Sequence, residues 1–163
     1  MQRTLVRALA EEGRFAEGEA LARATMAARL RQASDEQGNA RTLLILSRVL
    51  VEQGKLDEAE PRLQEAFTIF SKHPTRQPEE PPLAANWLGV IQVARKAYPE
   101  AEALLLPGSD QFFTPAAQMS PHERRLAIGH IVKLYEAWGR PKEAAVWQQK
   151  LDQLAKAGTS SQP

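Results

Sequence analysis

Residues 54–66 read GKLDEAEPRLQEA, and shorter versions of this stretch occur three more times along the chain. The related stretches are GRFAEGEA at 13–20, KAYPEAEA at 96–103 and GRPKEAA at 139–145. When the small residue after the glutamate is taken as an anchor, successive anchors lie 41, 42 and 43 residues apart. The four anchors are Gly18, Ala59, Ala101 and Ala144. A period in this range, with two helices in each unit, predicts a stacked helical solenoid.

The composition limits the function classes before any motif is considered. The chain has 163 residues, and its 43% apolar content is enough for the core of one domain. Its 21 Lys and Arg nearly balance its 20 Asp and Glu, so no global positive field indicates nucleic-acid binding. The chain contains no cysteine, which excludes disulfides and thiolate chemistry and fits a reducing compartment. Arg7 interrupts the apolar start, and no run approaches the ~20 apolar residues of a membrane span, so we expect a soluble, cytoplasmic protein without membrane contact.

Apolar residues at helical spacing predict eight helices and an all-α fold. The expected helices cover residues 1–11, 16–32, 40–53, 57–71, 83–95, 99–106, 121–138 and 141–156. Paired in order, they form a single solenoid domain, 1–156, with units at about 1–39, 40–81, 82–120 and 121–156. We expect four antiparallel helix pairs stacked into a right-handed superhelix. Residues 157–163 are expected to be a disordered polar tail.

Proline and glycine mark the places where the regular pattern is expected to break. Residues 73–82 contain four prolines and are interpreted as a non-helical loop between the second and third units. A Pro-Gly pair at 107–108 falls where the sixth helix would otherwise continue, so that helix is expected to stop there. Residues 109–120 then form an excursion. Ser120, followed three residues later by Glu123, has the spacing of a capping box that starts the seventh helix.

The repeated unit resembles the tetratricopeptide repeat, in the longer form of about 42 residues found in kinesin light chains and many bacterial proteins. The resemblance extends from Met1 to about Lys156. In that family the first helix carries a large-small pair and closes on a glycine, an aromatic residue follows, and an alanine opens the second helix. The matching residues are Leu46-Ser47 and Leu88-Gly89 for the pair, Gly13, Gly54 and Gly139 for the glycine, Phe15 and Tyr98 for the aromatic, and Ala59, Ala101 and Ala144 for the alanine.

Three positions depart from this pattern. Gly18 replaces the alanine of the first unit, Lys96 the glycine of the third, and Val132 the small residue of the fourth. Each departure affects the expected local geometry and leaves the repeat assignment intact. Residues 134–147 also resemble the closing repeat of arrays attached to bacterial serine/threonine protein kinases.

No catalytic or cofactor motif accompanies the repeats. His122 and His130 lie eight residues apart, whereas two metal ligands on one helix face need i, i+4 spacing. The acidic residues fall at helix starts and on helix surfaces, where the helix dipole and solvation explain them better than acid-base catalysis. The glycine-rich and catalytic loops of protein kinases are missing. We therefore expect no enzyme activity, no metal and no cofactor.

The resemblance also implies a concave groove, lined by the first helix of each unit at positions that flank the large-small pair. The groove residues selected in this way are Arg3, Arg7, Arg41, Ile45, Arg48, Asn86, Trp87, His130 and Lys133. They would form a basic rim over an aliphatic and aromatic floor, with Trp87 and Ile45 as apolar anchors. Such a groove suits an acidic or C-terminal segment of a partner protein. A solvated helix face whose arginines bind nothing is the alternative.

Two classes of function stay open. The first is a protein-interaction scaffold that holds a partner peptide or helix in its groove, because helical arrays present extended concave surfaces. The second is a non-catalytic C-terminal regulatory region or fragment of a larger enzyme, such as a bacterial serine/threonine protein kinase. In the first unit the face of Leu5, Val6 and Leu9 lacks a polar capping repeat, which predicts the C-terminal part of a longer array and self-association through that unit.

Overall fold

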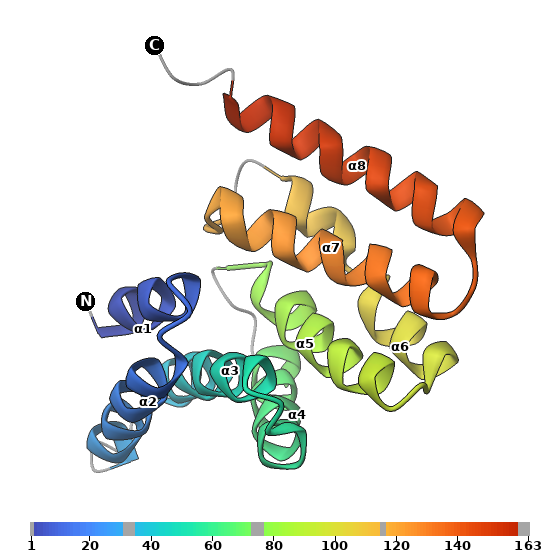
Figure 1. Cartoon of the computed structure of the whole chain (residues 1–163). Helices are drawn as coiled ribbons and strands as arrows, with labels where there is room; N and C mark the ends of the chain where they lie inside the picture. The colour runs from blue at the N-terminus through green and yellow to red at the C-terminus, as the bar shows by residue number, and fades with distance from the viewer. Residues whose placement is uncertain (1, 31–34, 73–76, 115–116, 160–163) are drawn as a thin grey trace. The chain divides into compact units, whose positions relative to one another are not determined.

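The computed structural model is all-α in the part of the chain that it describes (Figure 1). That part comprises residues 2–30, 35–72, 77–114 and 117–159, without the side chains of 2, 3, 29, 30 and 157–159. It holds eight α-helices and one 3-10 helix, which are α1 (Gln2–Glu11), α2 (Phe15–Leu30), α3 (Glu36–Glu52), α4 (Leu56–Lys72), α5 (Glu80–Ala94), α6 (Tyr98–Leu105), η1 (Ser109–Phe113), α7 (Pro121–Ala137) and α8 (Pro141–Thr159). Consecutive helices pack as antiparallel pairs, which confirms the predicted fold class.

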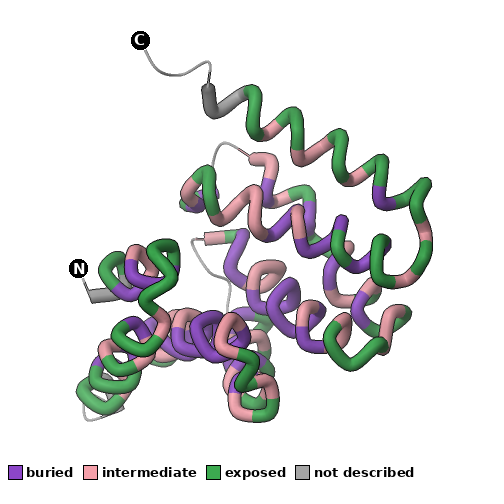
Figure 2. Tube along the Cα trace, in the orientation of Figure 1, coloured by how far each residue is buried: buried purple, intermediate pink, exposed green. Residues whose placement is uncertain are grey.

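The helices group into two compact units, which we call the N-terminal unit (Met1–Arg76) and the C-terminal unit (Gln77–Pro163). Each compact unit holds two of the predicted repeats, and the single solenoid domain over 1–156 stays a prediction. In the N-terminal unit α3 packs against α1, α2 and α4, and in the C-terminal unit α7 packs against α5, α6 and α8. Buried positions concentrate on α3, α5 and α7, while α8 is mostly exposed (Figure 2). The first helix of the second repeat is therefore central to each unit.

The turn inside each helix pair has the same hydrogen-bonded geometry throughout the chain. In the second repeat the Gly54 N–H donates to the Val51 carbonyl at 2.9 Å, and the Lys55 N–H donates to the Leu50 carbonyl at 2.8 Å. These are the two bonds of a Schellman motif, which places a left-handed residue after the helix end. Glycine takes that place in three repeats, with φ between 74° and 76° at Gly13, Gly54 and Gly139.

Lys96 takes the place of this glycine in the third repeat. Its φ is 62°, which is also in the left-handed region. The Lys96 N–H donates to the Val93 carbonyl at 3.0 Å, and the Ala97 N–H donates to the Gln92 carbonyl at 2.9 Å. The departure in sequence therefore leaves the turn unchanged, but it puts a lysine in a conformation that L side chains avoid.

The start of α3 differs from the sequence prediction. This helix begins at Glu36 rather than near residue 40. Asp35 caps it, because its carboxylate Oδ1 accepts a hydrogen bond from the Gly38 N–H at 2.8 Å. The cap and an acidic residue in the first turn stabilise a start through glycine and asparagine, which are poor helix formers.

The prediction that residues 73–82 are non-helical was wrong at its end. Helix α5 begins at Glu80, so Pro81 and Pro82 stand in its first turn. Proline is tolerated there because the first N–H groups of a helix have no partner within the helix. At the other end of the chain, α8 extends to Thr159, and the rest of the expected tail lies outside the described residues.

The connection from α6 to α7 confirms two local predictions. Helix α6 stops at Leu105, just before the Pro-Gly pair, and the chain turns through Gly108, which has φ 75°. The capping box is formed at the start of α7. The Ser120 hydroxyl accepts from the Glu123 N–H at 3.1 Å, and the Glu123 carboxylate accepts from the Ser120 N–H at 3.0 Å.

A single arginine holds this connection against α7. Arg124 donates to the carbonyls of Phe112 at 3.2 Å and Thr114 at 2.8 Å through Nη1, and to the carbonyl of Ala117 at 2.8 Å through Nη2. These carbonyls belong to the end of η1 and to the irregular segment after it, where Arg124 supplies charged hydrogen-bond donors to backbone oxygens. The side chain of Phe112 is fully buried beneath it.

Two glycines at helix crossings have different surroundings. A Cβ atom placed on Gly89 would lie 2.5 Å from Cγ of Leu105, so α5 and α6 cross there without room for a side chain. A Cβ atom on Gly18 would lie 3.6 Å from its nearest neighbours, the Leu9 Cβ and the Val6 carbonyl oxygen. This second site has room for the alanine that the other repeats carry.

Candidate partner-binding face

The predicted groove residues of the N-terminal unit come from α1 and α3, which pack against each other. Arg41, Ile45 and Arg48 follow on α3 at intervals of four and three residues, which puts them on one side of the helix. Arg41 and Ile45 are half-buried, and so is Arg7 on α1. Arg3 also belongs to α1, but its side chain lies outside the described residues. We call the set of Arg7, Arg41 and Ile45 the basic face.

Arg48 differs from the other arginines because it is only 6% exposed. Its Nε donates to Oε1 of Glu52 at 3.3 Å, one turn later on the same helix. A buried guanidinium that is already paired offers little surface to a partner. We therefore leave Arg48 out of the basic face.

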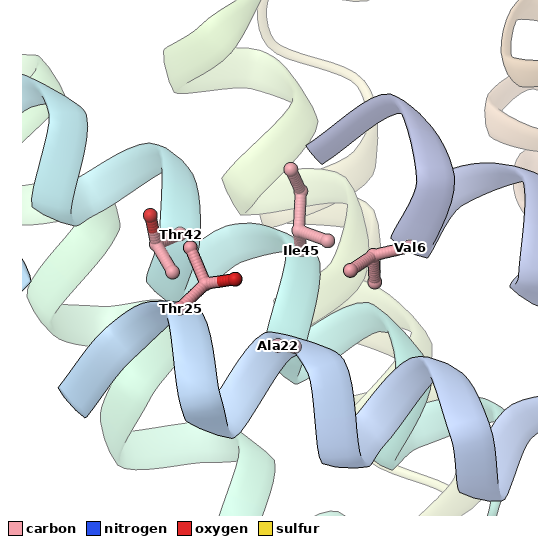
Figure 3. Close-up of a pocket in the computed structure, with 5 residues that line it drawn as sticks. All are labelled: Val6, Ala22, Thr25, Thr42 and Ile45. Atoms are coloured by element: carbon pink, nitrogen blue, oxygen red, sulfur yellow. The ribbon is translucent and has the colours of Figure 1, made fainter. Parts of the chain in front are cut away.

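A small pocket opens beside the basic face, between α1, α2 and α3 (Figure 3). Its lining residues are Val6, Ala22, Thr25, Thr42 and Ile45. Both threonine hydroxyls are satisfied within their own helices, since they donate to the carbonyls of Leu21 at 2.8 Å and Gly38 at 3.0 Å. The cavity measures about 10 Å³, which is room for about one water molecule. It is a gap in the packing rather than a site for a small-molecule ligand.

In the C-terminal unit three of the predicted groove residues meet in one buried cluster. Asn86 on α5 is fully buried and donates through Nδ2 to the Ala127 carbonyl on α7 at 3.0 Å. Its Oδ1 lies 2.7 Å from Nδ1 of His130. The amide nitrogen already faces a carbonyl, so the amide oxygen accepts and His130 carries a proton on Nδ1. The Trp87 ring meets the His130 ring edge to face, with centroids 4.7 Å apart.

This cluster changes the role expected for Trp87. The sequence interpretation made it an apolar anchor on an open groove, but its side chain is 4% exposed and His130 is 7% exposed. Such a ring stabilises the helix pair and has almost no surface for a partner. Lys133, one turn after Gly129 on α7, is exposed. Of the four groove residues selected in this unit, Lys133 is therefore the one with an accessible side chain.

Sequence reasoning missed an ion-pair network in the N-terminal unit. Glu19 on α2 accepts from Nζ of Lys55 at 2.7 Å and pairs with Arg23 at 2.8 Å. Arg23 also reaches Oε1 of Glu58 on α4 at 2.5 Å. The hydrogen bond from Lys55 is the main cause that lowers the pKa of the Glu19 carboxyl to about 2, assisted by Arg23 against the opposite effect of partial burial. The network ties the two repeats of the unit together on the side of their second helices.

A cluster of aromatic residues was also missed, in the C-terminal unit. Trp138 stacks on Tyr98 with centroids 5.9 Å apart and on Tyr135 at 6.5 Å, and the Arg140 guanidinium lies 3.6 Å from its ring centroid. The Tyr135 hydroxyl donates to Oε1 of Glu102 at 2.7 Å. Burial and this hydrogen bond to a carboxylate raise the pKa of the Tyr135 hydroxyl. The rings pack against the hydrophobic core of the unit, so the cluster is structural.

Paired antiparallel helices with one turn geometry in every repeat define an α-helical repeat protein. The family model of the tetratricopeptide repeat matches residues 1–72. The matched segment carries tetratricopeptide repeats, and the chain over its whole length is structurally similar to kinesin-light-chain-like arrays of such repeats. Repeats of this family generally serve in protein-protein interactions and are typically non-catalytic.

Solved structures support this assignment at the level of the fold. The crystal structure of BtubC (BKLC) from P. vanneervenii has a TM-score of 0.70 at 17% identity, and the match covers 99% of this chain and 65% of that one. Two structures of nearly identical TPR-like repeats, assigned to a kinesin light chain of Podosopora anserina, have TM-scores of 0.63 and 0.59 at 19% and 20% identity. These matches cover 98% and 99% of this chain and 76% of each of those chains. No curated protein matches the sequence.

Two further findings concern the chemistry of the molecule. Among the described residues, no three His, Asp or Glu side chains gather in a way that could hold a metal ion. None of the helices in the described ranges has both the length and the apolar content needed to cross a membrane.

Proposed function

We propose that this protein is a binding scaffold whose N-terminal unit holds an acidic segment of a partner protein on the basic face. The observation that carries the proposal is that Arg41 and Ile45 lie one turn apart on α3, which packs against α1, the helix that carries Arg7. Two guanidinium groups beside an aliphatic side chain fit a peptide that alternates carboxylates with apolar residues. Repeats of this family generally bind proteins, which agrees with this chemistry.

The charged and the apolar residues of the basic face should contribute differently to the binding free energy. A solvent-exposed pair between arginine and carboxylate contributes only about 0.2–1 kcal/mol, so two such pairs give orientation and modest affinity. The larger share has to come from apolar contact with Ile45 and the neighbouring helix surface. The guanidinium fork favours carboxylates over single-point acceptors, because it can donate two parallel hydrogen bonds.

We propose a different contribution from the C-terminal unit than the sequence suggested. Lys133 is exposed and can meet a carboxylate, whereas Asn86, Trp87 and His130 fix the spacing of α5 and α7 from within. We propose that this unit offers a second, weaker contact centred on Lys133. Its effect on affinity should be that of one exposed ion pair.

The test uses a fluorescein-labelled peptide of alternating glutamate and leucine, followed by fluorescence anisotropy at low and high salt. We expect the variant R7Q/R41Q to bind about fivefold more weakly than the wild type, as two exposed ion pairs would give. Salt should weaken binding to the wild type more than binding to the variant. K142Q, which removes an exposed lysine at the start of α8, is the matched control and should bind like the wild type.

Two results would contradict the proposal. If R7Q/R41Q and K142Q bind the acidic peptide equally well, the arginines are solvated surface. If a peptide with lysine in place of glutamate binds with the same affinity, contact with the face does not depend on charge. Circular dichroism of each variant shows whether a loss of binding is instead a loss of fold.

A further inference from the structure

An ion pair between consecutive repeats occurs at the same place in both units. In the N-terminal unit Lys55, directly after the closing glycine of the second repeat, pairs with Glu19 of the first repeat at 2.7 Å. In the C-terminal unit Arg140, directly after the closing glycine of the fourth repeat, lies 3.9 Å from Glu102 of the third. Both glutamates follow the anchor residue of their repeat. At both junctions, the basic residue after the turn of one repeat forms an ion pair with a glutamate on the second helix of the repeat before it.

The first repeat also has a basic residue directly after its closing glycine. Arg14 follows the closing glycine of α1, as Lys55 and Arg140 follow theirs. It now pairs with Glu17 at 2.7 Å and Glu12 at 3.2 Å, and its side chain is 51% exposed. Because exposed pairs of this kind contribute little, a change of partner would cost little.

The apolar half of the arrangement is also present. Leu5 on α1 occupies the repeat position of Leu46 on α3 and Ile131 on α7. Leu46 is 2% exposed where α1 and α2 pack against α3, and Ile131 is fully buried where α5 and α6 pack against α7. Leu5 is 52% exposed. In the repeats of Leu46 and Ile131, the preceding helix pair of the same unit covers this position.

We infer that the outer face of α1, formed by Leu5 and Arg14, docks a further helix pair of the same repeat type. That pair covers Leu5 with an apolar helix face and presents to Arg14 a glutamate placed directly after the small residue of its second helix. The last repeat of a second copy does not have this chemistry. It carries Ala145 at the position that Glu19 and Glu102 occupy. The partner is therefore a repeat that carries this glutamate rather than the end of another molecule of this chain.

The test supplies such a repeat by fusing a second copy of residues 1–38 ahead of the full chain, so that Glu19 of the added copy can face Arg14. Hydrogen exchange of the α1 amides is then compared with that of the unfused chain. We expect at least tenfold greater protection in the fusion. L5D in the original copy should abolish this gain, and E19Q in the added copy should reduce it. V146D, at the other large apolar side chain that is exposed in the described residues, is the control and should leave the gain intact.

Three outcomes would overturn the inference. The first is equal α1 protection with and without the added repeat. The second is a gain that L5D does not remove, because the added helices would then act at a distance from this face. The third comes from sedimentation of the unfused chain, where a dimer that L5D abolishes would show that a second copy covers Leu5.

Discussion

Replacement of Lys96 by glycine should stabilise the C-terminal unit. Lys96 has φ 62° at the position where the other three repeats use glycine, and its side chain is exposed. A left-handed conformation costs a residue with a side chain about 1–2 kcal/mol. Glycine removes this strain but loses about 0.5–1 kcal/mol through the greater freedom of the unfolded chain. We therefore expect a net gain of about 0.5–1 kcal/mol in the free energy of unfolding for K96G.

Urea unfolding followed by tryptophan fluorescence measures this gain in the right place. All three tryptophans lie in the C-terminal unit, at positions 87, 138 and 147, so their emission reports that unit alone. K96A is the control for the loss of the lysine side chain, and it should show no gain because alanine keeps the strain. G54A makes the reverse change in the N-terminal unit, and circular dichroism should show that unit losing about 1 kcal/mol.

The reasoning fails if K96G leaves the midpoint unchanged, or if K96A gains as much as K96G. The first result would mean that the left-handed conformation of Lys96 does not lower the stability of the unit. The second would mean that the side chain, rather than the backbone, is the source of strain. Equal slopes of the unfolding curves are needed for the comparison, since a changed slope would indicate an altered unfolded state.

Four other substitutions test the packing and the charges. G18A should raise the free energy of unfolding by about 0.5–1 kcal/mol, because a Cβ atom fits at this position. G89A should lower it by about 1–3 kcal/mol, because the crossing of α5 and α6 has no room for a side chain. Equal effects of the two substitutions in urea unfolding would contradict this difference between the crossings. Glu19 has a pKa lowered from 4.5 to about 2, so its contribution is present above about pH 5 and is lost as the pH falls towards 2. E19Q should remove this part of the pH dependence of stability while E65Q, at an exposed glutamate of α4, does not. W87A should lower the free energy of unfolding by about 3–5 kcal/mol, as removal of a buried aromatic side chain does. An unchanged melting temperature would show that Trp87 is not part of the core.

Local signals determined most of the fold from sequence alone. The turn glycines, the capping box at Ser120 and the Pro-Gly pair at 107–108 each act within a few residues, so their effect can be predicted without knowledge of the tertiary structure. The two early helix starts were missed because a cap at Asp35 and prolines in the first turn of α5 reverse the usual meaning of polar and proline-rich sequence. The repeat spacing also indicated the helix pairs, because each pair buries its apolar stripes against itself.

The exposure of the residues predicted to bind a partner depended on the tertiary structure. A repeat pattern fixes the side of its own helix on which a residue stands, but other elements that pack there decide whether it is exposed. Asn86 bonds to atoms 41 and 44 residues further along the chain, and those contacts draw Trp87 and His130 into the interior. Arg48 is buried beside Glu52, while Arg41, at the same helix side, is not. Burial depends on neighbours that are distant in sequence, and for that reason the sequence could propose a face but not determine which side chains remain accessible on it.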